Sequence, residues 1–305
     1  MKNRKILVVC SENSGRIAPF IEEQVNALKK IGLQMEIFGV KGKGIRGYLK
    51  NWKLLLQHIN EFQPDIIHAH YGLSGLLANL QRKVPVVTTY HGSDINDKRI
   101  FRISKLTIRL SEHNIFVSQK NVDKAKLKKK FSLISCGVDT SVFYPQNQEA
   151  CRREMKLSKE KKYILFAGAF DNQVKNASLA LNVVSTLKNT ELIELKDYTR
   201  ENVACLMNAV NACLMTSHSE GSPQFIKEAM ACNCPVVSVD VGDVKELLEG
   251  VKHCYLAKYD IQDISEKLNL LFENGERTNG KEKISNMHLD STSVARRILE
   301  VYNSI

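Results

Sequence analysis

Short apolar runs alternate with segments of helical periodicity along most of the chain, and this alternation restricts the fold more than any other feature of the sequence. Lys5–Val9 is a continuous apolar run, Phe20–Ile31 repeats apolar residues at helical spacing, and Gln34–Phe38 is expected to be a second strand. Strands that alternate with helices form parallel sheets through crossover connections. The later runs that predict strands cover residues 65–70, 85–90, 114–117, 132–134, 163–167, 192–195, 212–215 and 235–239.

The alternation is interrupted over Asp139–Lys162, which contains Pro145 and many polar residues. A chain of 305 residues has the length of about two domains. We therefore expect two doubly wound domains, residues 1–148 and 149–305, with a C-terminal helix over Ser293–Ser304 that can pack back across the junction. Ligands of such sheets bind beyond the carboxyl ends of the strands, and the cleft between two such domains is the expected site.

The charge of the chain is concentrated in its first half. Residues 1–148 contain 24 Lys and Arg against 11 Asp and Glu, whereas the remainder contains 20 against 22. A basic half favours an anionic partner, such as a phosphorylated substrate, an acidic membrane surface or a nucleic acid. The alternative is ordinary surface charge that keeps the protein in solution. No nucleic-acid-binding motif accompanies the charge, so a nucleic-acid partner is not expected.

The helix expected to begin near residue 223 has the features of a phosphate site. Ser222 suits its N-cap and Pro223 its first position, so the backbone N–H groups of the first turn would point at a ligand. The helix dipole would favour an anion there, and Gly221 would allow a ligand to approach the backbone closely. The residues whose N–H groups would bind are Gln224, Phe225 and Ile226.

Two glutamates, Glu220 and Glu228, belong to this segment, which reads SHSEGSPQFIKEAMACNCPVV. The Glu-x₇-Glu pair with its flanks is similar to the donor-site signature of glycosyltransferase family 4, which comprises retaining enzymes of the GT-B architecture. The chain resembles this family over nearly its whole length, and in particular its branch of teichuronic acid and capsule polysaccharide transferases. The other matching motifs are PDIIHAH at 64–70, TYHGSD at 89–94, CGVD at 136–139 with Phe143 and Pro145, and GAFDNQVKN at 168–176.

The resemblance implies a GT-B fold, in which two doubly wound Rossmann-like domains face a central cleft, the first on the acceptor side and the second binding the nucleotide sugar. It implies catalytic roles for three residues: Glu220 would contact the donor sugar, His91 would lie near the transferred sugar, and Lys175 would neutralise the leaving phosphate. Glu228 would accept hydrogen bonds from the ribose hydroxyls. The other donor-binding residues that it implies are Gly221, Ser222, Pro223, Gln224, Phe225, Ile226 and Gly168, and those on the acceptor side are Gly15 and Asp94.

The implied function is transfer of a sugar, with retention, from a nucleotide sugar to a growing, lipid-linked surface polysaccharide. The donor is expected to be a UDP-sugar and the reaction to be metal-independent, with no further cofactor. The sequence contains no Asp-x-Asp triplet that could bind a metal–diphosphate. His68 and His70 would share one face of a strand, but we identify no third ligand for a metal beside them.

The sequence departs from the family pattern at three positions and in the length of its second domain, and of these Ala169 and the short domain favour an alternative function. Ala169 stands where the family has an arginine in its phosphate loop, Asn176 replaces a glycine, and Gly15 is single where the family has a glycine pair. The second domain also lacks room for one strand–helix unit between residues 186 and 212. The alternative is a non-catalytic relative that binds a nucleotide sugar or partners another transferase.

A cytoplasmic protein is expected, because the apolar run near the N-terminus is too short for a signal peptide or a membrane span. Peripheral contact with the anionic inner face of the cell membrane is a further expectation. The alternative is that Leu49, Trp52 and Leu56 face the core while the nearby lysines are only solvated. The basic stretch that suggests this contact contains Lys41, Lys43, Arg46, Lys50 and Lys53, and the run over Lys124, Lys126, Lys128, Lys129 and Lys130 is interpreted as a solvated helix face.

Overall fold

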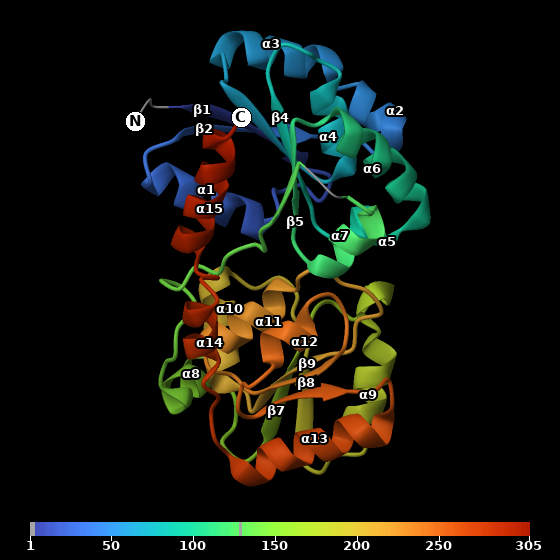
Figure 1. Ribbon diagram of the computed structural model, residues 1–305. Helices are drawn as coiled ribbons and strands as arrows, with labels where there is room; N and C mark the ends of the chain where they lie inside the picture. The colour runs from blue at the N-terminus through green and yellow to red at the C-terminus, as the bar shows by residue number, and fades with distance from the viewer. Residues whose placement is uncertain (1–3, 128–129) are drawn as a thin grey trace. The chain divides into compact units, whose positions relative to one another are not determined.

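The computed structural model describes residues 4–127 and 130–305, which form two compact units (Figure 1). The first unit is Met1–Gly137 with Ser291–Ile305, and the second is Val138–Asp290. The division therefore falls after Gly137 rather than after residue 148. The reason is a contact between segments distant in sequence: the N–H of Val138 donates to the carbonyl of Leu289 at 2.9 Å, so this segment already pairs with second-unit backbone.

The first unit contains a six-stranded sheet in the order β2-β1-β3-β4-β5-β6, with every pair parallel. Residues Ile6 to Cys10 are fully buried, as expected for a continuous apolar run in a parallel sheet covered on both faces. The strands are β1 (Lys5–Ser11), β2 (Gln34–Val40), β3 (Ile66–His70), β4 (Val86–Tyr90), β5 (His113–Phe116) and β6 (Phe131–Leu133).

Helices cover both faces of this sheet. Ile6 and Val8 pack in one apolar core with helices α1 and α15, whereas Leu7 and Val9 pack in another with α2, α3 and α4. The α15 helix, near the C-terminal end of the chain, therefore belongs to the first unit and lies beside α1, as Figure 1 shows. The helices are α1 (Pro19–Lys30), α2 (Gly44–Leu49), α3 (Trp52–Phe62), α4 (Gly72–Asn79), α5 (Ser93–Asn96), α6 (Lys98–Leu110), α7 (Gln119–Ala125) and α15 (Ser291–Asn303).

The second unit contains a five-stranded parallel sheet in the order β11-β10-β9-β7-β8. Between α9 and β9 only β8 and α10 occur, as expected from the short sequence there. The strands are β7 (Lys162–Phe166), β8 (Thr190–Ile193), β9 (Ala212–Met215), β10 (Val236–Val239) and β11 (Cys254–Ala257). The helices are α8 (Gln148–Glu154), η1 (Gln173–Lys175), α9 (Ala177–Ser185), α10 (Arg200–Ala209), α11 (Gln224–Ala231), α12 (Val244–Leu248), α13 (Ile261–Asn274) and α14 (Gly280–Asn286).

The two sheets share one strand order, because β2-β1-β3-β4-β5 and β8-β7-β9-β10-β11 follow the same path through space. In each, successive connections leave the first strand in opposite directions, which opens a crevice at the carboxyl ends of the two strands flanking that point. These strands are β1 and β3 in the first unit and β7 and β9 in the second. The topology thus predicts one ligand site at the strand ends of each unit.

Two helix predictions differ from the structure. The helix expected over 122–130 is α7, which ends at Ala125 because Lys126 adopts a left-handed conformation with φ 57°; Lys128 and Lys129 lie outside the described residues. The sequence reasoning also missed α6, although Asp97 gives it a clear beginning. The Asp97 side chain accepts hydrogen bonds from the N–H groups of Arg99 and Ile100.

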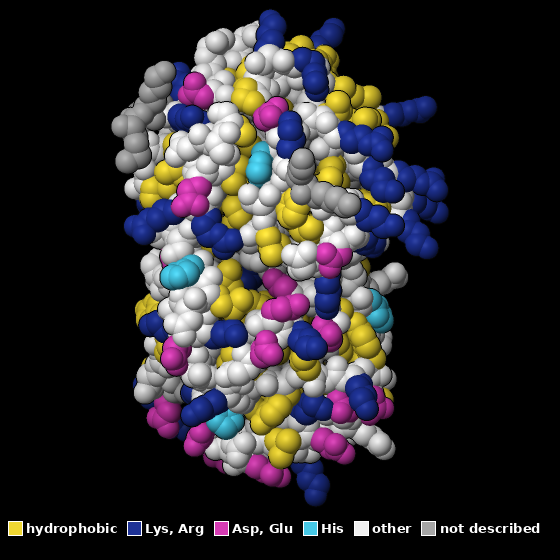
Figure 2. All heavy atoms as spheres, in the orientation of Figure 1, with side chains coloured by type: hydrophobic (Ala, Val, Ile, Leu, Met, Phe, Trp, Pro, Cys, Tyr) yellow, Lys and Arg dark blue, Asp and Glu magenta, His cyan; other side chains and the backbone are white. Residues whose placement is uncertain are grey.

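The layer of α2, α4 and α6 carries a basic surface interspersed with apolar side chains (Figure 2). On α6 the exposed residues are cationic except for Leu106, and the opposite face packs against α4. Leu49 is 45% exposed, which contradicts its assignment to the core. No helix in the part of the chain that the structure describes is long and apolar enough to cross a membrane. The α6 cations are Lys98, Arg99, Arg102, Lys105 and Arg109.

Candidate functional site

The loop after β9 and the start of α11 hold most of the residues expected to bind the donor. The helix begins at Gln224, with Pro223 at the N-cap in an extended conformation (φ −70°, ψ 118°) and no side-chain cap. The prediction that Ser222 is the N-cap and Pro223 the first helical residue is therefore wrong by one position. The ring of Pro223 is compatible with the extended N-cap, and the amides of the first turn still lack acceptors within the helix.

This loop lies backbone to backbone against the loop after β10. A Cβ atom on Gly242 would come within 2.4 Å of the carbonyl oxygen of Gly221, so the approach requires glycine, and Gly242 has a φ of 59°. Burial raises the pKa of the Asp243 carboxyl, and the Lys227 ammonium opposes this rise. Gly242 and Asp243, which follow β10 and lie outside the Glu-x₇-Glu segment, therefore hold this loop in place.

Lys175 and Glu220 form an ion pair at the carboxyl ends of β7 and β9. The distance from Lys175 Nζ to Glu220 Oε1 is 2.7 Å, and the two side chains are 22% and 17% exposed. Gly168 lies against the lysine, since a Cβ there would be 2.9 Å from Lys175 Cγ. Two hydrogen bonds of 2.9 Å from the Thr216 hydroxyl, to the carbonyls of Lys175 and Asn176, connect the loops after the two strands. Residues far apart in sequence thus meet at the crevice that the topology predicts.

Glu228 forms a second ion pair, with Arg200 at the first position of α10. Arg200 Nη2 is 2.6 Å from Glu228 Oε1, and the carboxylate side chain is only 5% exposed. The guanidinium carbon also lies over the ring of Phe143, 4.5 Å from its centroid. Both carboxylates of the Glu-x₇-Glu motif are therefore compensated by a cation from another element.

The sequence reasoning missed Arg200, Lys227 and Asp243. A signal for Arg200 was available, because a cation in the first turn of a helix is opposed by the helix dipole and its presence indicates an anionic partner. Lys227 interrupts a run of apolar residues on α11 and is fully buried. A lysine at such a position also indicates a buried anion nearby. For Asp243 we identify no local signal.

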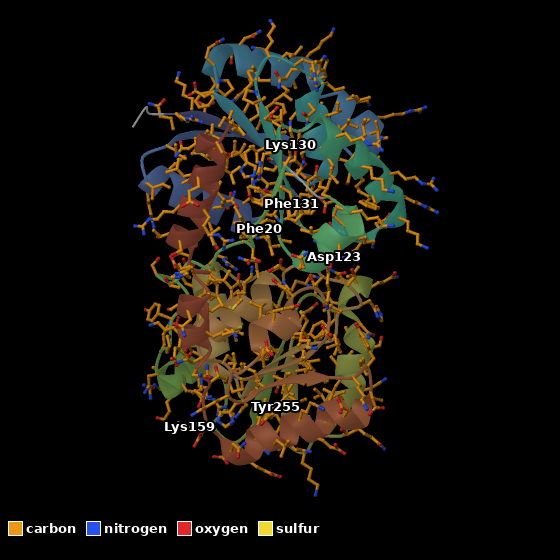
Figure 3. All side chains as sticks on the ribbon, viewed as in Figure 1. Phe20, Asp123, Lys130, Phe131, Lys159 and Tyr255 are labelled. Carbon is orange, nitrogen blue, oxygen red and sulfur yellow. The ribbon has the colours of Figure 1, made fainter. Side chains whose placement is uncertain are left out.

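The other expected residues belong to the first unit, where His91 follows β4 and is surrounded by rings. Its Nε2 is 2.9 Å from Nδ1 of His70, and its ring stacks on that of His70 with 5.1 Å between centroids. Phe20, labelled in Figure 3, contributes a further ring from α1 at 4.9 Å. His70 in turn stacks on His68, so the two histidines share one face of β3 as predicted. Burial together with His68 and His91 holds the pKa of His70 well below its usual range, which keeps it neutral.

Asp94 connects two backbone segments, the loop after β4 that carries His91 and the start of α4. One carboxylate oxygen accepts from the N–H groups of His91 and Gly92, and the other accepts from that of Gly72, all at 3.1 Å. Burial raises the pKa of Asp94 to about 7, although these hydrogen bonds oppose the rise. The carboxyl therefore shapes the loop that carries His91.

Asp94 lines a cavity of about 390 Å³ in the first unit. Gly15 lies in its bordering loop with a φ of 81° and no atom within 4 Å of an added Cβ, so this glycine is required by conformation rather than by space. Hydroxyls, a guanidinium and aromatic rings line the cavity, a combination that suits a sugar. The lining residues are Ser11, Asn13, Ser14, Arg16, Ala18, Ile21, Tyr48, Tyr71, Leu73, Ser93, Asp94 and Ile100.

Metal coordination has no candidate in residues 4–127 and 130–305: no three His, Cys, Asp or Glu side chains are grouped so that they could hold an ion. His68 donates or accepts at Thr89 Oγ1 (2.7 Å) and at the hydroxyl of Tyr302 (2.5 Å), so both of its ring nitrogens are engaged by α15 and β4. These contacts explain the histidine pair of β3 by packing.

Comparisons with known proteins match both halves of the chain. Residues 7–142 match the family described as Glycosyltransferase Family 4, and residues 188–274 match Glycosyl transferases group 1. The chain is 24% identical over 238 residues to TuaC of Bacillus subtilis (strain 168), a protein named as a glycosyltransferase of teichuronic acid biosynthesis. This match covers 68% of the chain and 61% of TuaC, so the chain spans about three fifths of that relative's length.

Solved structures share the fold. The sucrose-phosphate synthase of Thermosynechococcus elongatus superposes with a TM-score of 0.85 at 15% identity, covering 99% of this chain and 98% of that one. HepE of Anabaena, solved in complex with UDP-glucose, superposes with a TM-score of 0.79 at 17% identity, covering 99% and 100%. The chain therefore contains a Glycosyltransferase Family 4 domain in its first half and a Glycosyl transferases group 1 domain in its second half, and it has the GT-B architecture.

Proposed function

We propose that this protein transfers a sugar, with retention of anomeric configuration, from a UDP-sugar to a growing surface polysaccharide carried on a lipid. The observation that carries the proposal is the pairing of both motif carboxylates with cations, Glu220 with Lys175 in the loops after β7 and β9, and Glu228 with Arg200 at the start of α10. An ion-paired lysine beside a helix N-terminus can bind a diphosphate, and carboxylates can accept bonds from sugar hydroxyls. HepE, which shares the fold, was solved in complex with UDP-glucose, and that complex supports a UDP-sugar as the donor.

Each group has a role in this proposal. Lys175 exchanges Glu220 for the diphosphate and stabilises the negative charge that develops on the leaving phosphate. Glu220, released from the lysine, contacts the transferred sugar. Glu228 binds the ribose. The amides of Gln224, Phe225 and Ile226 hold the phosphates, with Gly168, Gly221, Ser222 and Pro223 shaping the loops around them.

The acceptor side of the proposal rests on the first unit. His91 is assigned to the transferred sugar, and its ring is held by His70 and Phe20. The cavity bordered by Gly15 and Asp94 is assigned to the acceptor, because its polar and aromatic lining suits a glycan. We propose that transfer needs no metal, because Lys175 and the amides of the first turn of α11 can neutralise the diphosphate.

The membrane contact is the last part of the proposal. The first unit contains 26 Lys and Arg against 11 Asp and Glu, whereas the second contains 18 against 22. Exposed apolar residues accompany the cations on α2 and α6, and each cation near an anionic surface contributes about 1 kcal/mol of attraction. This surface is suited to peripheral binding at the inner face of a cell membrane, where a lipid-linked acceptor would be reached.

A second candidate is a non-catalytic relative that binds a nucleotide sugar without transferring it. Ala169 favours it, because the loop from Gly168 to Lys175 lacks the arginine that the family resemblance leads one to expect. The segment between α9 and β9 is also reduced to β8 and α10. Nucleotide binding is common to both candidates, so only turnover separates them.

The test is incubation of the purified protein with a panel of nucleotide sugars and lipid-linked glycan acceptors. Transfer is followed by mass spectrometry, and the anomeric configuration of the product by NMR. We expect turnover of at least one UDP-sugar with a retained anomer. An inverted product would refute retention. Binding of nucleotide without turnover of any donor would instead support the second candidate.

A further inference from the structure

Arg200 occupies a position that its local environment opposes. It is the first residue of α10, where the positive end of the helix dipole faces it. Its guanidinium is nevertheless held on two sides, by Glu228 Oε1 at 2.6 Å and by the ring of Phe143 at 4.5 Å. Phe143 is fully buried and cannot move aside without opening the core of the second unit. The arginine is thus a fixed element of the site.

The burial of Glu228 explains why a fixed cation is needed. A carboxylate that is only 5% exposed is costly without a charged or hydrogen-bonding partner. The guanidinium engages one of its two oxygens and thereby fixes the plane of the carboxylate. The orientation of the other oxygen, Oε2, is then set by the ion pair rather than by hydrogen bonds to water.

We propose that Arg200 is a positioning residue that aims Glu228 at the ribose, and that it thereby sets a preference for ribonucleotides over deoxyribonucleotides. The proposal rests on the proposed function, in which Glu228 meets the nucleotide. A hydroxyl at C2′ or C3′ donates to the oriented Oε2, whereas a deoxyribose leaves this buried oxygen without its donor. Sites built to bond a hydroxyl discriminate strongly against ligands that lack it.

In a competing role, Arg200 would replace the arginine that the family has at the position of Ala169 and would bind the diphosphate. The geometry favours the ribose, because the partner of Arg200 is Glu228 whereas the phosphate-loop lysine, Lys175, pairs with Glu220. The two roles predict different ligand dependences. A phosphate-binding arginine would matter for UDP and not for uridine, irrespective of the ribose hydroxyls.

The experiment measures dissociation constants by calorimetry for UDP, its 2′-deoxy and 3′-deoxy forms, and uridine. We compare the wild type with Arg200→Gln and Arg200→Lys. The matched control is Arg152→Gln, because Arg152 also lies over a ring in the second unit, 5.8 Å from the Tyr163 centroid, but bonds to the carbonyl of Ala209. Thermal unfolding of each variant shows whether it is folded under the conditions of the titration.

The wild type should bind UDP about tenfold more tightly than at least one deoxy form, which corresponds to about 1.4 kcal/mol. Arg200→Gln should remove most of this ratio, Arg200→Lys should keep part of it, and Arg152→Gln should leave it unchanged. An equal weakening of all ligands in Arg200→Gln, with the ratio preserved, would overturn the inference. So would a loss confined to the phosphorylated ligands. Failure of the wild type to bind UDP at all would overturn the proposed function itself.

Discussion

Replacing Glu220 by glutamine should separate nucleotide binding from sugar transfer. The carboxylate of Glu220 forms an ion pair with the ammonium of Lys175 at 2.7 Å, and both side chains are mostly shielded from water. A diphosphate must displace this carboxylate before it can bind the lysine. Glutamine keeps the size of the side chain and removes the charge that competes with the phosphate.

The magnitude follows from the pair that is broken. A hydrogen bond between charged groups contributes about 1.5–3 kcal/mol, and the lower end applies here because water reaches part of both side chains and rehydrates the displaced carboxylate. Relief of about 1.4 kcal/mol would tighten UDP binding about tenfold. Transfer should fall strongly in the same variant, because the carboxylate that contacts the transferred sugar has been lost.

Calorimetric titration with UDP and a transfer assay with the best donor measure the two effects. Lys175→Met is the matched comparison, since it removes the other partner and should weaken UDP and abolish transfer together. If Glu220→Gln weakens UDP as much as Lys175→Met does, the carboxylate does not compete with the phosphate, and the exchange on which this reasoning depends is wrong.

Four further outcomes are expected. Burial raises the pKa of Asp94 to about 7, so the contribution of this carboxyl to folding stability is full below about pH 4 and is lost as the pH rises through 7. The loss is on the order of 4 kcal/mol. Asp94→Asn should therefore flatten this part of the profile of unfolding free energy against pH in chemical denaturation, and an unchanged slope would contradict this expectation. Gly168→Ala should weaken UDP severalfold in calorimetry, since its Cβ would press on Lys175 Cγ, and unchanged affinity would exclude that contact. Transfer should persist in EDTA; complete loss that magnesium or manganese restores would show that a metal takes part. Charge reversal on α6 should release the protein from anionic vesicles in sedimentation, whereas the same reversal on the second unit should not; equal binding of the wild type to neutral vesicles would contradict a membrane role. The exchanged residues are Arg99, Arg102 and Lys105, with Lys188, Lys245 and Lys281 as the control.

Periodicity and composition predicted much of the local structure correctly. The runs that form β1 and β9 are apolar because a parallel sheet covered by helices buries both faces of its strands. The residues of the Glu-x₇-Glu segment are contiguous, so their placement after a strand and along a helix could be predicted within one position. The boundary at 148 could not, because the segment after Gly137 is assigned to the second unit by pairing with Leu289.

The partners of the site residues were decided by tertiary structure. Lys175 meets Glu220 because β7 and β9 are neighbours in the sheet although β8 lies between them in sequence, and Arg200 meets Glu228 because α10 packs against α11. The hydroxyl of Tyr302 likewise reaches His68 because α15 returns to the first unit. Hydrophobic periodicity reports which face of an element is buried, but strand order and the return of a helix depend on contacts between distant segments. The sequence by itself therefore determined the elements and the chemical groups available, and the tertiary structure decided which groups meet.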